Sequence, residues 1–298
     1  MTNFFTNEFE PSSSAAWKQK IQFELEGADY NKTLLTETNE GITIKPFYHS
    51  DSFEKLNIPE GSAQFTICKP FIISSEIKAN KLAIEAINSN FKTIKFIVNK
   101  PFNSSLLFKN LLDRNITFYF EFNFFSEEFL KNLFQTLKNE TSYFNIDIIG
   151  KIASTGNWYK SLSSDFKIVE NTIKNNLTNY SLSVNAITYH NAGANSVQEI
   201  AYALAHANEY LTFFGPEVAH KIHFNFSIGA NFFFEIAKIR AFRYLYSLIL
   251  KEYNTSTKLS IGTQPSLIYT NQPTSDILIS NISGVNTFEE DSENEFSK

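Results

Sequence analysis

The sequence predicts a parallel α/β fold, and more specifically a TIM-type (β/α)8 barrel with its helices on the outside. Three observations support this prediction. From about residue 63 onwards, short apolar runs alternate with longer amphipathic runs, which is typical of repeated strand–helix units with parallel strands. No glycine-rich phosphate loop follows the first run, which favours a closed barrel over an open doubly wound sheet. The length of 298 residues suits one barrel.

The first segment, residues 1–62, differs from this alternation and is predicted to form a helical and extended arm. Ser12–Ser14 can cap a helix that begins near Ala15, and Gly27 can end it. Short extended or turn-like segments follow. Nothing in this pattern indicates a core of the arm's own. We therefore expect it to lie across another surface, either its own barrel or a partner.

The barrel is predicted to occupy residues 63–285, and each of its first six strands is followed by a helix. The predicted strands are 64–71, 93–98, 116–122, 146–152, 181–187, 222–228, 259–263 and 276–280. The predicted helices are 75–88, 104–112, 127–138, 165–175, 196–211 and 232–253.

The last crossover departs from this regularity. Twelve residues separate Thr263 from Asp276, and they include Pro265 and Pro273. Parallel neighbours need a crossover of about a dozen residues or more, usually helical, and two prolines oppose a helix there. The sequence therefore predicts a barrel that is abbreviated at its last strand–helix unit. Residues 286–298 are polar and acidic and are predicted to be a disordered tail.

Composition excludes several classes of function. The net charge is −5 and no basic stripe is present, which argues against a nucleic-acid partner. No apolar run reaches membrane-spanning length, and the first residues do not follow the pattern of a signal peptide. Cys68 is the single cysteine, which excludes an internal disulfide and fits a reducing cytoplasm.

Five residues follow or end predicted strands on the face where barrels carry their sites. We regard them as candidate barrel-mouth or partner contacts, with an ordinary structural role as the alternative for each: Trp158, Tyr189, His190, Asn191 and Gln264. His220 and His223 have a helical metal-like spacing, but no carboxylate or cysteine accompanies them, so no metal site is predicted. Glu235 and Lys238 are predicted to form an intrahelical pair.

Two motifs suggest a family. One is AGAN-x-x-x-E from Ala192 to Glu199, and the other is G-x-N-F-F-x-E-I-A-K-x-R-A-x-R from Gly229 to Arg243. Together they resemble the methylmalonyl-CoA mutase family. The segments 17–30, 40–48 and 150–159 are similar to the small (beta) subunit of two-subunit members. The resemblance covers roughly residues 10–255.

This resemblance implies an adenosylcobalamin-dependent isomerase that interconverts methylmalonyl-CoA and succinyl-CoA, with acyl-CoA along the barrel axis. Active members carry a Tyr-His pair before the Ala-Gly-Ala, and here those positions are Ile187 and Thr188. The cobalt-binding motif Asp-x-His-x-x-Gly does not occur in these residues. The chain thus resembles a C-terminally truncated small subunit, with no catalytic, cofactor-binding or metal residues expected. Adenosylcobalamin is expected in the assembled enzyme through the large (alpha) subunit.

Two alternatives stay open: a catalytically active acyl-CoA isomerase barrel that uses His190, and a decayed, truncated product. The sequence also leaves open which face of the segment 117–123 lines the barrel. Phe118, Phe120 and Phe122 share one face, and polar residues share the other. A phenylalanine face pointing inward would close the barrel axis, whereas a polar face would permit a channel.

Overall fold

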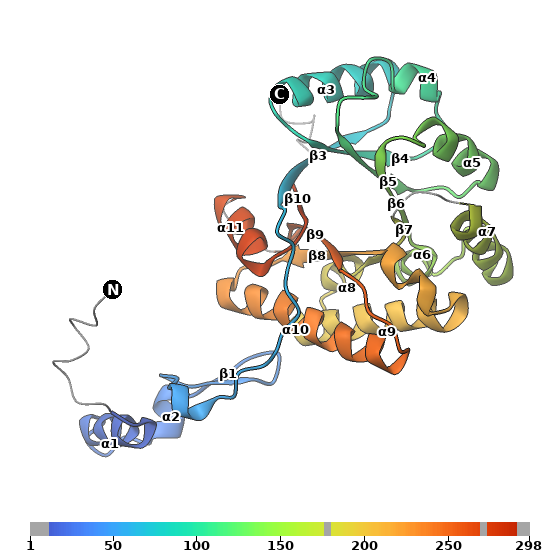
Figure 1. Cartoon of the computed structure of the whole chain (residues 1–298). Helices are drawn as coiled ribbons and strands as arrows, with labels where there is room; N and C mark the ends of the chain where they lie inside the picture. The colour runs from blue at the N-terminus through green and yellow to red at the C-terminus, as the bar shows by residue number, and fades with distance from the viewer. Residues whose placement is uncertain (1–11, 176–179, 269–272, 291–298) are drawn as a thin grey trace. The chain divides into compact units, whose positions relative to one another are not determined.

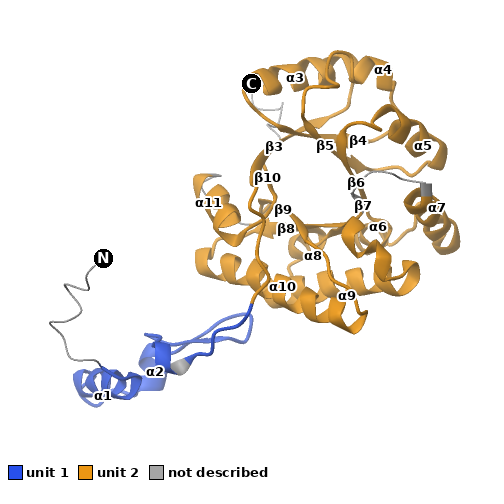
Figure 2. Cartoon of the chain, viewed as in Figure 1, with its two compact units in different colours: residues 1–57 blue, residues 58–298 orange. Residues whose placement is uncertain are grey.

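The computed structural model describes residues 12–175, 180–268 and 273–290 (Figure 1). The chain divides into two compact units, Met1–Asn57 and Ile58–Lys298 (Figure 2). The division lies close to the predicted boundary between arm and barrel.

Within the described residues, the first unit consists of short secondary-structure elements that do not enclose a hydrophobic core. Its elements are α1 (Ser14–Glu24), α2 (Tyr30–Leu34), the antiparallel pair β1 (Thr36–Glu37) and β2 (Thr43–Ile44), and the 3-10 turn η2 (Ser50–Ser52). As predicted, a serine caps α1: the Ser13 hydroxyl accepts a hydrogen bond from the N–H of Ala16. No side chain that the structure describes between residues 12 and 57 is buried.

The second unit is a closed barrel of parallel strands in the order β10-β3-β4-β5-β6-β7-β8-β9 (Figure 1). This confirms the predicted TIM-type barrel. The strands are β3 (Thr66–Ile72), β4 (Thr93–Val98), β5 (Thr117–Phe122), β6 (Thr141–Ile146), β7 (Tyr180–Asn185), β8 (Ile222–Ile228), β9 (Ser260–Pro265) and β10 (Thr287–Glu289).

Helices surround the strands (Figure 1). They are α3 (Glu76–Asn88), α4 (Ser104–Leu107), α5 (Glu127–Thr136), α6 (Ile148–Thr155), α7 (Leu162–Asn175), α8 (Ile187–Asn191), α9 (Ser196–Phe214), η3 (Pro216–Lys221), α10 (Phe232–Glu252) and α11 (Pro273–Ser283). Of the helices in the described ranges, none has both the length and the apolar character needed to span a bilayer.

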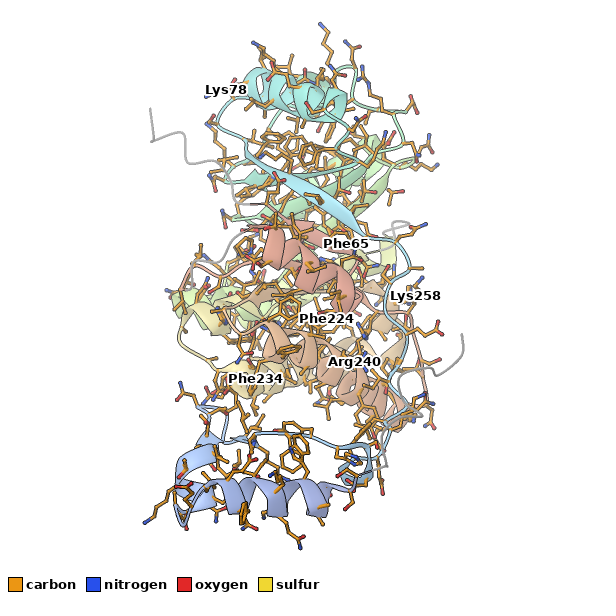
Figure 3. All side chains as sticks on the ribbon, turned by 90° about the vertical axis from the view of Figure 1, so that its left-hand side faces the viewer. Phe65, Lys78, Phe224, Phe234, Arg240 and Lys258 are labelled. Atoms are coloured by element: carbon orange, nitrogen blue, oxygen red, sulfur yellow. The ribbon has the colours of Figure 1, made fainter. Side chains whose placement is uncertain are left out.

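The main core lies between the strands and these helices, and phenylalanine dominates it. Phe96, Phe118, Phe120 and Phe144 are fully buried on the outer face of neighbouring strands. The Phe120 and Phe144 rings stack with centroids 5.2 Å apart. Because these strands alternate strictly, apolar residues point to the helices and polar residues point to the barrel axis. Side-chain packing of this kind extends around the barrel, and Figure 3 labels Phe224, which packs edge-on against Phe242 of α10.

The last strand–helix unit is complete, so the prediction of an abbreviated barrel is wrong. Segment 276–280, predicted as the eighth strand, lies within α11, and the eighth strand is β10, which pairs with both β9 and β3. Pro273 is the first residue of α11, where its missing N–H removes no intrahelical hydrogen bond. The barrel therefore continues past residue 285, where the acidic tail was predicted to begin; residues 291–298 lie outside the described residues.

The fourth strand is also displaced from its prediction. It runs over Thr141–Ile146, whereas most of the predicted segment 146–152 belongs to helix α6. Asp147 caps that helix, and its carboxylate accepts a hydrogen bond from the N–H of Gly150. A short apolar run such as this one fits a buried strand and the start of a buried helix equally well.

Two glycines bring the start and the end of the barrel together. The N–H of Ser62 donates to the carbonyl of Gly284 over 2.8 Å. Gly284 has φ +72°, and a Cβ at this position would lie 2.8 Å from the Cα of Gly61. Only glycine combines this backbone conformation with this close approach.

We expect Gly284→Ala to destabilise the barrel more than Gly193→Ala. Gly193 also has a positive φ, of +99°, but no atom would lie within 4 Å of an added Cβ. Gly193→Ala therefore carries only the backbone cost of about 1–2 kcal/mol, whereas Gly284→Ala adds a clash with Gly61. Urea denaturation of the two purified variants measures the difference. Equal losses would contradict the proposed close packing.

Candidate functional site

The barrel axis is lined by polar side chains, which answers the question left open by the sequence. The ammonium of Lys95 on β4 lies 2.7 Å from Glu121 on β5 and 2.7 Å from Glu289 on β10. Tyr119 and Tyr143 stack with their ring centroids 4.3 Å apart. The polar face of β5 therefore points inward, and its phenylalanines point to the helices.

A layer of rings fills the axis below the carboxyl ends of the strands. Tyr119 and Tyr143 lie 5.3 Å and 5.7 Å from His223 between ring centroids. The space left at this level is a cavity of about 10 Å³, room for about one water molecule. A polar lining thus does not leave an open channel, and an extended CoA arm cannot pass along the axis in this conformation.

His223 is held in this layer as a neutral ring. Its Nδ1 lies 2.7 Å from the Ser260 hydroxyl and its Nε2 lies 3.0 Å from Asn225 Oδ1. Burial lowers its pKa to about 3. Gly262 leaves room for the ring, because a Cβ there would lie 2.9 Å from His223 Nε2. Both ring nitrogens of His223 thus contact neighbouring side chains. The described residues contain no cluster of three or more His, Cys, Asp or Glu able to hold a metal ion.

Above this layer, the carboxyl ends of the strands surround a cavity of about 440 Å³, which we call the mouth cavity. Its lining includes Lys95, Glu121, Asp147 and Glu289. Burial alone would lower the pKa of Lys95, but the carboxylates of Glu121 and Glu289 reverse this effect and raise it. Lys95 therefore stays protonated and links β4 to both β5 and β10.

Asp147, at the rim of this cavity, contacts polar groups from three elements, α6, β7 and α9. Its Oδ1 accepts hydrogen bonds from the Gly150 N–H at 2.6 Å and the Tyr210 hydroxyl at 3.1 Å. Its Oδ2 accepts the Asn185 N–H at 2.9 Å. Nε2 of His206 lies 3.1 Å from Oδ1. Burial opposes ionisation of Asp147, yet His206 and these donors hold its pKa below the ordinary value.

Two of the five candidate residues reach the mouth cavity. Asn191 and Gln264 line it, together with Ile187 and Thr188. The last two occupy the positions where the resemblance expects Tyr-His. The mouth therefore presents the aliphatic side chain of Ile187 in place of the expected phenol, and the short hydroxyl of Thr188 in place of the expected imidazole.

Tyr189 and His190 are directed elsewhere. His190 is 6% exposed, and its Nε2 lies 2.7 Å from the Ser266 hydroxyl. The Tyr189 hydroxyl lies 3.1 Å from His206 Nδ1. His190 does not share the direction of residue 188, because residues 187–191 form helix α8 and side chains two positions apart share a side only along a strand.

Trp158 lies at a second, more open cavity of about 420 Å³, which Phe124, Tyr159 and Lys160 also line. Its ring packs edge-on against Phe166 of α7, with centroids 6.0 Å apart. This Trp is half-buried. Its packing is compatible with both alternatives given for it, a structural side chain and a partner contact.

Sequence reasoning did not identify Lys95, Glu121, Asp147 or Glu289 as members of a site. A signal for Lys95 and Glu121 exists, because each alternates with outward phenylalanines or isoleucines in its strand. Asp147 was missed because it was placed inside a predicted strand, and Glu289 because it was assigned to the tail.

A separate cluster of buried charges joins the two helices that carry the family-like motifs. The Lys238 ammonium lies 2.8 Å from Glu199 of α9 and 2.6 Å from Glu235, and it donates to the Ser227 carbonyl at 2.7 Å. The predicted Glu235–Lys238 pair is confirmed, but it is buried rather than superficial. Arg240, labelled in Figure 3, is exposed on the same helix.

Comparison with known proteins adds independent findings. The profile of the methylmalonyl-CoA mutase family matches residues 135–279. The methylmalonyl-CoA mutase small subunit of Porphyromonas gingivalis is 28% identical over 290 residues, covering 85% of this chain and 46% of that protein. A methylmalonyl-CoA mutase of Cereibacter sphaeroides is 39% identical over 92 residues, covering 29% of this chain and 13% of that protein.

A third relative, the methylmalonyl-CoA mutase large subunit of Streptomyces virginiae, is 35% identical over 89 residues, covering 28% of this chain and 12% of that protein. The chain thus spans less than half the length of each of these three relatives.

Proposed function

Because the chain belongs to the methylmalonyl-CoA mutase family, we propose that it is a small, non-catalytic subunit of an adenosylcobalamin-dependent mutase. In this proposal it pairs with a large subunit and stabilises it. Two observations carry the proposal: the first unit exposes large apolar side chains, and the mouth of the barrel unit lacks the Tyr-His pair of active members.

The arm supports the pairing. Trp17, Phe23, Tyr48, Phe53 and Leu56 are between 51% and 79% exposed. No described side chain of the first unit is buried, so these residues have no core to stabilise them. Large apolar side chains exposed together mark surfaces that a partner covers.

The mouth supports the absence of catalysis. Ile187 and Thr188 cannot supply the oriented, strong hydrogen bond that an imidazole gives to a reacting carbonyl. The axis beneath them is filled by rings, so the pantetheine arm of acyl-CoA has no path. The second hypothesis, an active isomerase based on His190, has no support because that ring is directed away from the mouth cavity.

The buried histidines of the barrel do not fit the cofactor that the family implies. Cobalt ligation needs an accessible imidazole, and no histidine lines the mouth cavity. His190, His206 and His223 are buried and engaged with neighbouring side chains. We therefore assign adenosylcobalamin to the large subunit and derive no step through it here.

Co-expression with a large mutase subunit tests the proposal. We expect the two chains to co-purify, and the large subunit to melt at a higher temperature in the pair than alone. The isolated small chain, given methylmalonyl-CoA and adenosylcobalamin, should show no turnover. A clean monomer that leaves the partner's stability and activity unchanged would overturn the proposal.

The arm variant Trp17→Asp/Phe23→Asp should abolish co-purification without changing the melting temperature of the isolated chain. Buried aromatic anchors contribute about 2 kcal/mol or more each to an interface, or roughly 30-fold in Kd. Ile77→Asp, at a 69% exposed position on α3, is a matched control that should still pair. Normal pairing by the double variant, or a lower melting temperature of the chain alone, would contradict the role of the arm.

A further inference from the structure

The mouth cavity has the shape of a small-molecule site. Its volume of about 440 Å³ lies within the range of ligand pockets. The layer of Tyr119, Tyr143 and His223 closes it from below, leaving only about 10 Å³ at that level. A ligand must therefore enter from the carboxyl ends of the strands and be compact.

The charges of the cavity favour a cation. Four carboxylates line it, those of Glu121, Asp147, Glu289 and Glu290, against the ammonium groups of Lys95 and Lys151. Lys69, outside the lining, pairs with Glu290 over 2.9 Å, so an excess of one negative charge remains. Lys95 is already shared between Glu121 and Glu289. A concave site in which charges of one sign outnumber the other concentrates ligands of the opposite sign.

The phenol of Tyr159, which also lines the cavity, is influenced by the same negative charges. Burial raises its pKa most, and the carboxylates of Asp147 and Glu121 raise it further. A negative potential at the rim opposes formation of a further anion and attracts a cation.

Two side-chain amides of the cavity lining have oxygen atoms without a hydrogen-bond partner among the described residues. Asn145 is 9% exposed, lines the cavity, and has an Oδ1 without a hydrogen-bond partner among the described residues. Asn185 lines the same cavity and its Oδ1 is likewise unpartnered in that part of the chain. Rotation about χ2 exchanges the oxygen and nitrogen of an amide without moving the backbone. A ligand that donates hydrogen bonds would therefore satisfy these groups.

These neighbours are placed by strand register. Asn145 of β6 pairs in register with Glu121 of β5, so an amide lies beside a carboxylate. Asn185 of β7 pairs with Asn225 of β8, which also lines the cavity. The acidic side chains of the described residues do not come together in a cluster of three or more that could hold a metal ion. The arrangement suits a small organic cation better than a metal ion.

From these features we infer that the mouth cavity binds a small aliphatic amine, whose protonated nitrogen donates to Glu121 and to the amides of Asn145 and Asn185. This activity goes beyond the proposed subunit role and does not depend on it. Methylmalonyl-CoA, the substrate that the family name implies, carries a negatively charged carboxylate, whereas the proposed ligand is a cation.

Isothermal titration of the full chain with 1,4-diaminobutane tests this inference. Two probes of the same carbon length are matched controls, the neutral 1,4-butanediol and the anionic succinate. We expect the diamine to bind most tightly, the diol weakly and succinate not at all, with affinity for the diamine falling as salt is raised. Succinate binding equal to or tighter than the diamine, or no diamine binding, would overturn the inference.

Two variants locate the site. Glu121→Gln removes the carboxylate and should weaken diamine binding about tenfold or more. Asn185→Leu removes an amide and should weaken diamine binding by a smaller factor. This variant tests the site even if Glu121→Gln fails to fold. Glu128→Gln, at an exposed position on α5, is the matched control and should bind as the unaltered chain does. Unchanged binding by both site variants would rule out the mouth cavity.

Discussion

A chain in which Lys238 is replaced by methionine should have a free energy of unfolding about 3–5 kcal/mol lower than the unaltered chain. Lys238 lies between the carboxylates of Glu199 and Glu235, and all three residues are buried. Methionine fills a similar volume but removes the ammonium that both carboxylates contact. The loss should therefore come from uncompensated charge and not from a cavity.

The pH dependence separates these two causes. In the unaltered chain, burial alone would raise the pKa of Glu199, but Lys238 and His190 hold it below the ordinary value of 4.5. Without Lys238, burial dominates and the folded-state pKa of Glu199 rises above the unfolded value. The folded variant then binds more protons than its unfolded form, so its stability rises as the pH falls from neutral toward 4.5.

Urea denaturation at several pH values measures this behaviour. The deficit of Lys238→Met should be largest near neutral pH and should shrink in acid. Adding Glu199→Gln and Glu235→Gln should restore most of the loss at neutral pH, because no buried charge remains. Lys251→Met, at an exposed position of the same helix, should be nearly neutral. A pH-independent deficit would mean that packing, and not charge, sets the role of Lys238.

The sequence predicts strands well where buried apolar residues alternate with other residues along one short run. Strands β4 (Thr93–Val98) and β8 (Ile222–Ile228) have the boundaries predicted for them. The prediction of the last helix failed because proline both interrupts helices and favours their first position. Pro273 was interpreted as a helix breaker, whereas it begins α11, a position that proline favours.

The site was harder to predict because it depends on barrel closure. The two faces of β5 follow from its alternation, but only the surrounding helices decide that Phe118 and Phe120 point outward. The contact between Lys95 and Glu289 joins residues 194 positions apart. No local pattern encodes such a contact, since it exists only after β10 completes the ring.

Replacing Asp147 with alanine should also lower the free energy of unfolding by about 3–5 kcal/mol. The carboxylate accepts hydrogen bonds from the N–H groups of Gly150 and Asn185 and from the Tyr210 hydroxyl. Alanine would leave these donors, of which those of Gly150 and Tyr210 belong to buried residues, without their acceptor. It would also remove the cap of helix α6.

Asp147→Asn provides the matched control, because it keeps the shape and one acceptor oxygen but removes the charge. It should lose less than Asp147→Ala. The pKa of Asp147 is held below its ordinary value of 3.8 in the folded chain, so its stabilisation is present above that pH and disappears as the pH falls through the folded-state pKa. The unaltered chain and Asp147→Ala should therefore differ most near neutral pH and converge in strong acid. Equal stability of the two at neutral pH would show that the groups around Asp147 find other partners, and that the mouth is not organised by this carboxylate.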